Sequence, residues 1–327
     1  MKKFLHLVDD TALGGVNVAL RNFKDPTIAA LGDMQVETVS PKNARAQTYD
    51  CDTILIHFTV AWAKIPYLAD LRRRNQSARI ILIEHTYTQH FERWNVGSRV
   101  RFRTMLNIAY ACVDQVIAVS NAQGDWLQKL TRTATVSAIP QSRCMKSLLA
   151  IDPSDDEGDK PVVFGAIGRF HQQKGFDELI LAFRECALPN AVLRIAGYGE
   201  DEWRLAALAQ GAPNIEFIGA VKDPKAFYEH VDCVIVPSRW EAFGLVASEA
   251  IAAGCYVIAA DVDGLTEQII GIGSLVPAGD KDRMVEVISE ISATGRVKIR
   301  SVAKRYRDRA GERYNAMIND WRQLLSA

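Results

Sequence analysis

CVIVPSRWEAFGLVASEAIAAGCYVIA, residues 233–259, contains two short apolar runs on either side of a helical segment. The runs CVIV at 233–236 and YVIA at 256–259 have no polar alternation, which is typical of parallel strands buried on both faces of a sheet. The Ala-rich stretch that starts near Gly244 predicts a helix between them. A strand, a helix and a second parallel strand form the repeating unit of a doubly wound sheet.

The same alternation extends along the chain in both directions. Further strand-like runs lie at 3–8, 53–57, 79–83, 115–119, 162–167, 192–196 and 215–218. Helical patterns fall between them, for example at 176–186 and 201–209. The polar and acidic segment DPSDDEGDK, 152–160, has no apolar residue and predicts a linker. We therefore expect an α/β protein with two doubly wound, Rossmann-like domains, residues 1–151 and 161–305.

Size and composition agree with two domains. The chain has 327 residues, of which 48% are hydrophobic, enough for two full cores. No apolar run approaches the ~20 residues that span a bilayer, and the apolar run FLHLV is too short for a signal peptide. Six scattered cysteines form no CxxC pair, which favours buried, reduced thiols in a cytoplasmic protein.

Charge is unevenly distributed along the chain, although the formal net charge is zero. Residues 1–150 carry 19 Lys and Arg against 12 Asp and Glu, and residues 151–295 carry 11 against 24. Residues 296–327 are basic again, with 9 against 3. An acidic middle between basic ends argues against nucleic acid as a partner.

Charged side chains follow the expected strands at their carboxyl ends, where doubly wound sheets bind ligands. The loop RFHQQKG carries Arg169 and Lys174, which together could neutralise a diphosphate without a metal ion. The loop that contains Glu241 leads to Gly244, where a helix N-terminus suits a phosphate. Glu249 can accept hydrogen bonds from two vicinal hydroxyls. For each charge, an ordinary solvated surface position is the alternative.

Two features of the N-terminal half could also bind a ligand. Gly14 and Gly15 lie between a strand and a helix, where a missing side chain permits close approach to a ligand; a simple tight turn is the alternative. His85 follows the strand-like run at 79–83, with a purely structural role as its alternative. The turn GYGED at 197–201 is not a full GxGxxG fingerprint and is weak evidence for a dinucleotide.

Several stretches of the second half resemble family 4 of the retaining glycosyltransferases, which have the GT-B fold. The stretches are GRFHQQKGFDELILAF, LRIAGYGED, NIEFIGAVKD, YEHVDCVIVPSRWEAFGLVASEAIAAG, VDGLTEQI and GSLVPAGD, in the order and spacing of the family. The similarity covers about 160–285 closely and the N-terminal half loosely, where VIAVSNAQGDWL resembles the end of the first domain. It implies two Rossmann-like domains with a cleft between them. It also implies a C-terminal helix, residues 306–327, that crosses back onto the first, acceptor-side domain.

The resemblance also implies roles for matched positions. The donor-binding residues that it implies are Gly14, Gly15, Gly168, Arg169, Lys174, Glu241, Phe243, Gly244, Leu245 and Glu249. Arg169 and Lys174 would hold the donor diphosphate, Glu249 the ribose hydroxyls, and Glu241 the donor sugar. His85 would lie near the reacting centre, so the catalytic residues would be His85, Glu241, Arg169 and Lys174. We expect neither a metal ion nor another cofactor.

The expected activity is retaining transfer of a sugar from a nucleotide-diphosphate donor to a glycan or lipid-linked acceptor, in surface polysaccharide or lipopolysaccharide synthesis. A GT-B epimerase or phosphorylase, and a catalytically silent partner subunit, are the alternatives. Two stretches depart from the family pattern. Pro140-Gln141-Ser142 stands in place of a proline-asparagine-glycine turn, and Asp263-Gly264 in place of a glycine pair.

Two groups of arginines make the first domain basic. Arg72, Arg73, Arg74 and Arg79 form the first group, and Arg93, Arg99, Arg101 and Arg103 form the second. The second group is interleaved with Trp94, Val96, Val100, Phe102, Met105 and Leu106, a mixture that suits an interfacial segment. We expect a cytoplasmic protein with peripheral contact to the inner face of an anionic membrane. A solvated basic face above ordinary core residues is the alternative.

Overall fold

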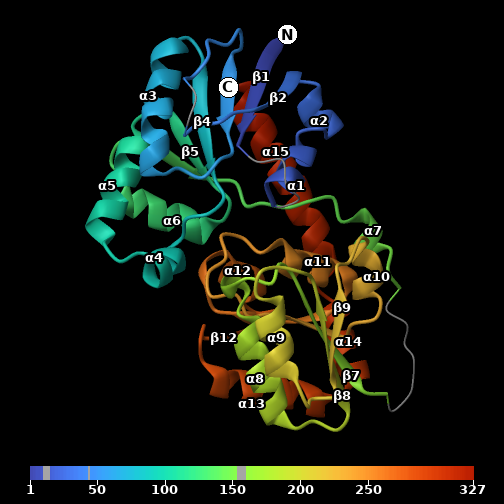
Figure 1. Cartoon of the computed structure of the whole chain (residues 1–327). Helices are drawn as coiled ribbons and strands as arrows, with labels where there is room; N and C mark the ends of the chain where they lie inside the picture. The colour runs from blue at the N-terminus through green and yellow to red at the C-terminus, as the bar shows by residue number, and fades with distance from the viewer. Residues whose placement is uncertain (10–14, 43–44, 153–159) are drawn as a thin grey trace. The chain divides into compact units, whose positions relative to one another are not determined.

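The computed structural model describes residues 1–9, 15–42, 45–152 and 160–327, which form two compact units. The first unit consists of Met1–Arg143 and Tyr314–Ala327, and the second of Cys144–Arg313. Each unit contains one six-stranded parallel sheet with flanking helices (Figure 1). The two doubly wound sheets that the apolar runs predict are therefore confirmed.

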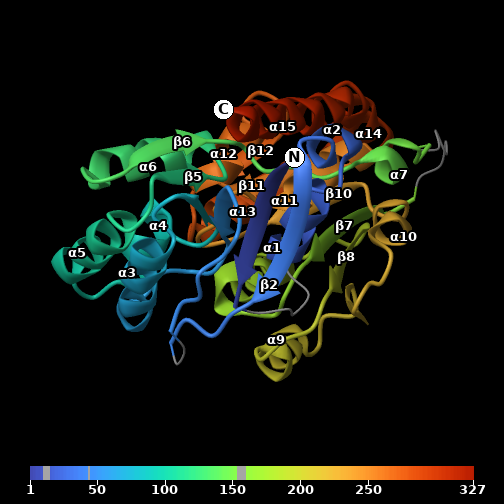
Figure 2. The same ribbon diagram turned by 90° about the horizontal axis from the view of Figure 1, so that it is seen from above.

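The sheet of the first unit has the strand order β2-β1-β3-β4-β5-β6. Its strands are β1 (Lys2–Val8), β2 (Gly32–Thr38), β3 (Thr53–Ile56), β4 (Arg79–Glu84), β5 (Gln115–Ala118) and β6 (Thr135–Ala138). Its helices include α1 (Gly15–Asn22), α2 (Pro26–Ala29), η1 (Trp62–Lys64), α3 (Ile65–Arg74), α4 (Gln89–Asn95), α5 (Arg99–Tyr110) and α6 (Asn121–Leu130). Figure 2 shows β1 and β2 side by side. Because β1, β3 and β4 pair in parallel, their carboxyl ends meet at one edge.

The sheet of the second unit has the order β12-β11-β10-β7-β8-β9. Its strands are β7 (Val162–Ile167), β8 (Ala191–Ala196), β9 (Ile215–Gly219), β10 (Cys233–Val236), β11 (Tyr256–Ala260) and β12 (Ser274–Val276). Its helices include α7 (Lys146–Leu149), η2 (Gln172–Lys174), α8 (Phe176–Cys186), α9 (Glu202–Ala209), α10 (Pro224–Tyr228), α11 (Leu245–Ala253), α12 (Asp263–Ile269), α13 (Lys281–Thr294) and α14 (Arg296–Lys304). The helices predicted at 176–186 and 201–209 are confirmed as α8 and α9.

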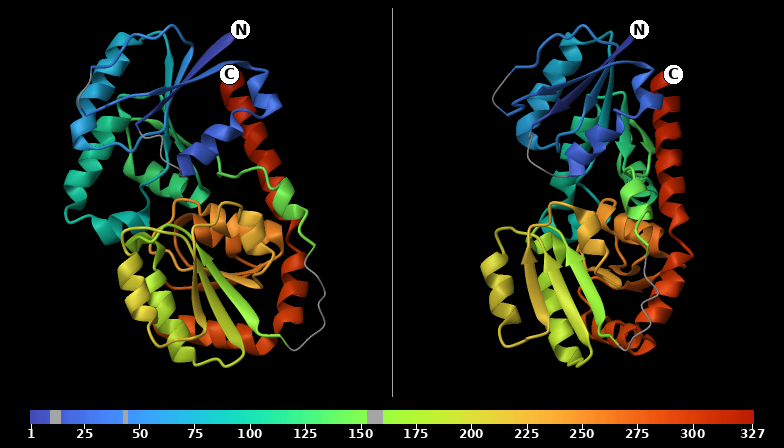
Figure 3. Two further views of the ribbon diagram at one scale, coloured as in Figure 1. Left: turned by 45° about the vertical axis from the view of Figure 1, so that its right-hand side comes forward. Right: turned by 90° about the vertical axis from the view of Figure 1, so that its right-hand side faces the viewer.

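Helices cover both faces of the second sheet, as Figure 3 shows. Phe164 and Ile235 pack into a core with α8 and α13, whereas Val234 and Val257 pack into a separate core with α11 and α12. Successive side chains of a strand point to opposite faces. Burial on both faces therefore requires the continuous apolar runs that the sequence contains.

The sequence pattern does not predict β2, β6 and β12. All three lie at the edges of their sheets. Val36 in β2 is 57% exposed, and the residues of β6 are exposed or half-buried. An edge strand packs on fewer neighbours, so its residues can be polar and its sequence resembles that of a loop.

The two units divide at a different place from the linker predicted at 152–160, of which 153–159 lie outside the described residues. Residues 144–151 belong to the second unit, not to the first as predicted. Met145, Leu148 and Ile151 explain this assignment, because all three are buried in the core that contains α11.

The C-terminal helix α15 (Asp308–Ser326) is shared between the two units. Its start belongs to the second unit, where Ala310 is buried in the core. From Tyr314 onward it belongs to the first unit, where Trp321 lies edge-on to Phe23 with ring centroids 4.9 Å apart. The segment that packs on the first unit therefore starts later than residue 306, the position predicted.

The described part of the chain has neither a membrane-spanning helix nor a disulfide bond. No helix there is long and apolar enough to cross a bilayer. All six cysteines are free. Cys233 and Cys255 are buried as expected, whereas Cys144 is exposed.

Candidate functional site

Three loops meet at the carboxyl edge of the second sheet. The strands that precede them, β7, β10 and β11, are adjacent and parallel, so the loops start at the same edge. The backbone amide of Arg239 donates to the carbonyl of Gln173 at 2.8 Å. The side-chain amide of Gln173 donates to the carbonyl of Trp240 at 3.0 Å. These bonds hold the loop of Lys174 against the loop of Glu241.

Lys174 and Glu241 form a partly buried ion pair between the two loops. Nζ of Lys174 donates to Oε2 of Glu241 at 2.5 Å, and the two side chains are only 19% and 13% exposed. The hydroxyl of Ser238 donates to the same oxygen at 3.2 Å. The amide of Glu241 donates to the carboxylate of Asp263, the first residue of α12 after the third loop, at 3.2 Å. Burial strengthens such charge interactions relative to the surface.

Glycines allow these loops to approach each other. Gly175 has φ of +65°, and a Cβ there would lie 2.2 Å from the carbonyl oxygen of Pro237. A Cβ on Gly264 would lie 2.4 Å from the carbonyl oxygen of Ala242. Asp263, which replaces a glycine of the family pattern, has φ of +41°, a left-handed conformation that aspartate adopts more readily than most residues. The departure from the pattern is therefore compatible with the loop.

Arg169 belongs to the same loop sequence as Lys174, RFHQQKG, but its side chain is exposed. It makes no ion pair with residues for which the structure gives a placement, so its guanidinium is available to an anion. Gly168 precedes it, and the turn after β8 packs directly on that glycine. A Cβ on Gly197 would lie 1.9 Å from the carbonyl oxygen of Gly168. The two predicted cations thus differ: Lys174 is paired with Glu241, whereas Arg169 is exposed and has no ion pair to a residue of described position.

The helix α11 brings a buried carboxylate and free backbone amides to this region. Gly244, with φ of +93°, precedes the helix, and the first amides of a helix have no intrahelical acceptor. Phe243 is buried and Leu245 half-buried. Glu249 is only 7% exposed, and its Oε2 accepts a hydrogen bond from the hydroxyl of Tyr228 at 2.9 Å. A glutamate on an exposed helix face, the alternative interpretation, is therefore wrong for Glu249.

Three histidines lie at the carboxyl edge of the first sheet. His6 is in β1, His57 follows β3 and His85 follows β4. Nδ1 of His6 is 2.9 Å from Nε2 of His57, and Nδ1 of His57 is 3.3 Å from Nε2 of His85. Burial lowers the pKa of His6 and of His85 to about 4. Burial, with the neighbouring imidazoles, lowers the pKa of His57 well below its ordinary value.

The sequence pattern predicts a site role for His85 but not for His6 or His57. The sequence does contain a pattern that could have identified them: both residues lie near the carboxyl ends of strand-like apolar runs, where ligands bind. Their adjacency depends on the order β1-β3-β4, which the sequence does not reveal. Of the predicted glycines in this unit, Gly14 lies outside the described residues and Gly15 is the first residue of α1.

The histidines predict that the first unit loses stability in mild acid. A histidine with a lowered pKa takes up a proton on unfolding at pH values between its folded-state pKa, about 4 for His6 and His85, and its ordinary pKa of ~6.5. Since the folded state then binds fewer protons, the free energy of unfolding falls as the pH falls from about 6.5 to 4, by up to about 1.4 kcal/mol per pH unit for each histidine. Urea unfolding at several pH values measures this slope. His6→Leu should make it shallower; an unchanged slope contradicts the prediction.

A family model for glycosyl transferases group 1 matches residues 150–310, which include all three loops and α11. Residues 150–310 are a glycosyl transferases group 1 domain. The family resemblance that the ordered motifs indicate is thereby confirmed. The family model does not extend over the first unit, which carries the three histidines.

Curated relatives match the group 1 domain and neighbouring residues. The lipopolysaccharide core biosynthesis mannosyltransferase LpsB of Rhizobium meliloti is 29% identical over 197 residues, which are 53% of this chain and 54% of LpsB. The capsular polysaccharide biosynthesis glycosyltransferase CapM of Staphylococcus aureus is 32% identical over 138 residues, 39% of this chain and 36% of CapM. An uncharacterized glycosyltransferase of Methanocaldococcus jannaschii is 38% identical over 126 residues, 37% of this chain and 31% of that protein. The matches thus span between 31% and 54% of these relatives.

Solved structures resemble the whole chain in fold. Sucrose-phosphate synthase from Thermosynechococcus elongatus has a TM-score of 0.80 at 20% identity, covering 99% of this chain and 98% of that one. Anabaena HepE in complex with UDP and glucose has a TM-score of 0.79 at 19% identity, covering 100% of both chains. The chain therefore has the GT-B fold, with the group 1 domain as its second Rossmann-like part.

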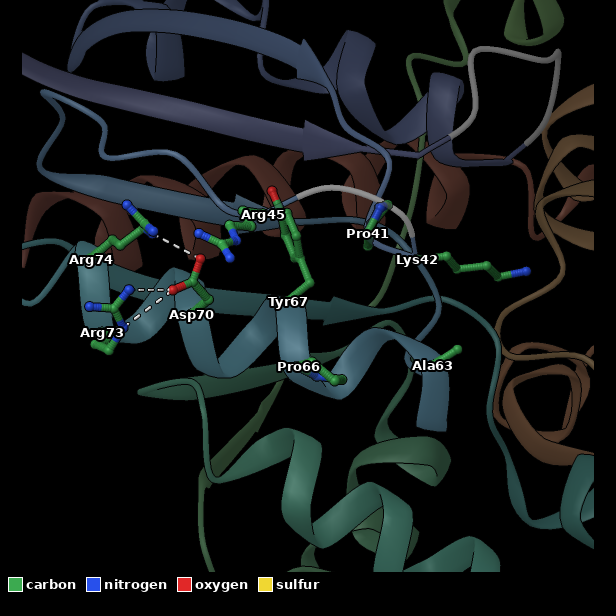
Figure 4. A pocket seen from close by; sticks show the side chains of 9 residues that line it. All are labelled: Pro41, Lys42, Arg45, Ala63, Pro66, Tyr67, Asp70, Arg73 and Arg74. Atoms are coloured by element: carbon green, nitrogen blue, oxygen red, sulfur yellow. Dashed lines mark hydrogen bonds and ion pairs between the residues drawn. The ribbon is translucent and has the colours of Figure 1, made fainter.

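A pocket of about 480 Å³ lies beside α3 in the first unit, outside the group 1 domain (Figure 4). Its charged lining residues are Lys42, Arg45, Asp70, Arg73 and Arg74. Asp70 accepts hydrogen bonds from Arg73 at 2.7 Å and from Arg74 at 2.8 Å. Four cations against one anion leave a net charge of +3 on the lining, so the pocket suits an anionic group.

The first basic group, residues 72–74 and 79, makes ion pairs and hydrogen bonds within the first unit. Each of its arginines has an internal partner: Arg72 contacts Asp114, Arg73 and Arg74 contact Asp70, and Arg79 contacts Gln115 and Leu324. These arginines are therefore held in place and are less available to a membrane than the sequence suggests.

The second basic group divides into buried and exposed parts. Phe102, Met105 and Leu106 lie in the core of the first unit, so the prediction that they form an interfacial surface is wrong. Arg103 pairs with Glu92 at 2.7 Å. Besides Arg103, the exposed members are Arg93, Trp94, Arg99, Val100 and Arg101. We call these five residues the α4–α5 patch.

Proposed function

We propose that the protein is a retaining glycosyltransferase that moves a sugar from a nucleoside-diphosphate donor to a glycan or lipid-linked acceptor. The observation that carries this proposal is the convergence of Lys174, Glu241 and the N-terminus of α11 at one sheet edge of a group 1 domain. LpsB and CapM, which match this domain, are named for lipopolysaccharide core and capsular polysaccharide synthesis. We therefore place the reaction in the synthesis of a surface polysaccharide or glycolipid.

In this proposal the charged residues of the three loops bind the donor. Arg169 and Lys174 neutralise the diphosphate, and the amides at the start of α11 donate to its oxygens. Glu249 accepts from the ribose hydroxyls, while Glu241 and the amides from Phe243 to Leu245 hold the sugar. The cationic pocket of the first unit supports an acceptor with phosphate or carboxylate groups.

The proposed reaction takes place on one face of the donor sugar. The bond from the anomeric carbon to the diphosphate oxygen breaks, and a bond to the acceptor hydroxyl oxygen forms on the same face. The acceptor proton passes to the departing phosphate oxygen, so the anomeric configuration is kept. Positive charge from Arg169 and Lys174 stabilises the leaving diphosphate, which lets the reaction proceed without a metal ion.

Product analysis with a panel of nucleotide sugars tests the proposed function. Proton magnetic resonance of the fresh glycoside should show the anomeric configuration of the donor, and activity should persist in excess chelator. An inverted linkage contradicts the retaining step. Loss of activity in chelator that a divalent cation restores contradicts the metal-independent step. A sugar phosphate formed only with inorganic phosphate would instead identify a phosphorylase, and isomerisation of the donor sugar without transfer would identify an epimerase.

Glu249→Gln is expected to weaken binding of the nucleoside diphosphate. Charge-assisted hydrogen bonds contribute about 1.5–3 kcal/mol, so Kd should rise about 10- to 150-fold. Calorimetry with UDP, GDP and ADP measures this, using whichever binds the wild type. Tyr228→Phe is the matched control, because it removes the hydroxyl bonded to Glu249 and keeps the carboxylate. Unchanged affinity in Glu249→Gln would leave Glu249 a structural role only.

We also propose that the α4–α5 patch contacts the inner face of an anionic membrane. Arg93, Arg99 and Arg101 are exposed, and the apolar residues Trp94 and Val100 beside them are 47% and 80% exposed. A cation near an anionic leaflet contributes about 1 kcal/mol, so three together contribute about 3 kcal/mol.

Replacing Arg93, Arg99 and Arg101 with glutamate should abolish co-sedimentation with anionic vesicles at low salt. In the control, glutamate replaces Lys222, Lys298 and Arg305, which are exposed residues of the second unit. The net charge of the protein then changes by the same amount as in the test variant. If both triple variants bind the anionic vesicles equally, the attraction depends on net charge and not on the α4–α5 patch. Wild-type protein that binds anionic and neutral vesicles equally would exclude the proposed contact.

A further inference from the structure

His6, His57 and His85 form a chain of contacts and not a common metal site. His57 uses opposite ring nitrogens, Nε2 toward His6 and Nδ1 toward His85, so the three rings do not converge on one point. The rings are nearly parallel, with interplanar angles of 28° between His6 and His57 and 17° between His57 and His85. Each nitrogen-to-nitrogen contact is short enough to hold one shared proton.

The number of ring protons allows the three histidines only two patterns of hydrogen bonding. Burial keeps all three imidazoles neutral at pH 7, so together they carry three ring protons. The two contacts use two of these protons, one in each. The third proton must then lie at one end of the chain, on Nε2 of His6 or on Nδ1 of His85. A proton on one end fixes the direction of both hydrogen bonds.

The two ends of the chain have different surroundings. His6 is 1% exposed, and its Nε2 has no hydrogen-bond partner among the residues with described positions. The ring centroid of Phe23 lies 4.4 Å from that of His6, and the ring centroid of Trp321 lies 4.9 Å from that of Phe23. His85 is half-buried. Buried N–H groups without an acceptor are rare in folded proteins, so the third proton is better placed at the His85 end.

We propose that His6 and His57 are positioning residues that hold His85 in the Nδ1–H tautomer. In this arrangement Nδ1 of His6 donates to Nε2 of His57, and Nδ1 of His57 donates to Nε2 of His85. The Nδ1–H of His85 points away from the chain as a fixed hydrogen-bond donor. Its use toward an oxygen of the reacting sugar or acceptor rests on the proposed function, whereas the tautomer itself does not.

Nitrogen magnetic resonance of histidine-labelled protein tests the tautomer directly, with no substrate present. The chemical shifts of a neutral imidazole distinguish the protonated nitrogen from the bare one. An imidazole in water favours Nε2–H, so Nδ1–H on His85 is a signature that burial alone does not produce. The expected result is Nδ1–H on all three rings at pH 7. Nε2–H on His85 overturns the proposal.

Variants at His57 separate positioning from packing. His57→Phe fills the same space without ring nitrogens, and His85 should revert to Nε2–H. His57→Gln can still donate toward His85, so it should retain more of the Nδ1–H form; it also serves if His57→Phe does not fold. His171→Gln, in the second unit, should leave the His85 signals unchanged. Unchanged His85 tautomer in both His57 variants overturns the proposal.

Activity measurements then address the use of the donor. Loss of one hydrogen bond should lower kcat/KM about 10-fold in His57→Phe, with partial recovery in His57→Gln. If the tautomer changes as expected and kcat/KM does not, the positioning role stands and the proposed contact of His85 with substrate is excluded. If no transfer occurs in the wild type, the proposed function fails while the tautomer result remains valid.

Discussion

Lys174→Ala is expected to reduce kcat/KM by about 100-fold or more while the protein remains folded. The substitution removes a charge-assisted hydrogen bond to the donor diphosphate, which contributes about 1.5–3 kcal/mol, equivalent to about 10- to 150-fold in rate. It also leaves Glu241 without the cation that lies 2.5 Å from it. An unpaired carboxylate next to a diphosphate adds like-charge repulsion, so the loss should be in the upper part of this range.

A double variant separates these two contributions. The double variant Lys174→Ala, Glu241→Gln has no carboxylate to repel the diphosphate. It should therefore bind the free nucleoside diphosphate more tightly than Lys174→Ala does, even if sugar transfer is not restored. Lys225→Ala is the matched control, since Lys225 pairs with Glu229 at the surface of the same unit. Arg169→Ala should show the simpler loss of about 10- to 150-fold, because Arg169 makes no ion pair within the described part of the chain. Wild-type rates in folded Lys174→Ala would exclude the diphosphate role.

Asp232→Asn should destabilise the second unit by about 3–5 kcal/mol. Asp232 is fully buried directly before β10 and accepts from Nε of Arg296 at 2.8 Å and from Nε of Arg300 at 2.5 Å. Its other oxygen accepts from the amide of Val163 in β7 at 2.9 Å. Asparagine keeps the shape but loses the negative charge beside the buried guanidinium of Arg300, and removing one partner of a buried ion pair is strongly destabilising.

Urea unfolding of Asp232→Asn measures this cost. Glu216→Gln is the matched control, because Glu216 pairs with Arg194 at 2.9 Å but the two side chains are 46% and 34% exposed. A surface ion pair of this kind contributes about 0–1 kcal/mol, so the control should unfold almost as the wild type does. Equal small effects in both variants would contradict the view that burial sets the strength of the Asp232 cluster.

Local sequence by itself determined the elements of this protein and the chemistry of its loops. The runs around 233–236 and 256–259 had to be buried strands, because such apolar runs are stable only when both faces are covered. Lys174 and Glu241 could be assigned to loops at carboxyl strand ends, since each follows a recognisable strand and precedes a helix. Edge strands such as β2 and β6 escaped detection, because exposure removes the apolar pattern.

Only the tertiary structure decided which of these residues meet. Lys174 and Glu241 are 67 residues apart, and they pair because β7 and β10 are neighbours in the sheet. The strand order β1-β3-β4 likewise brings His6, His57 and His85 into contact with one another. The division of α15 at Tyr314 depends on which unit buries each end of the helix. Strand order and helix docking depend on packing between distant segments, and periodicity within a short stretch of sequence carries no information about such long-range contacts.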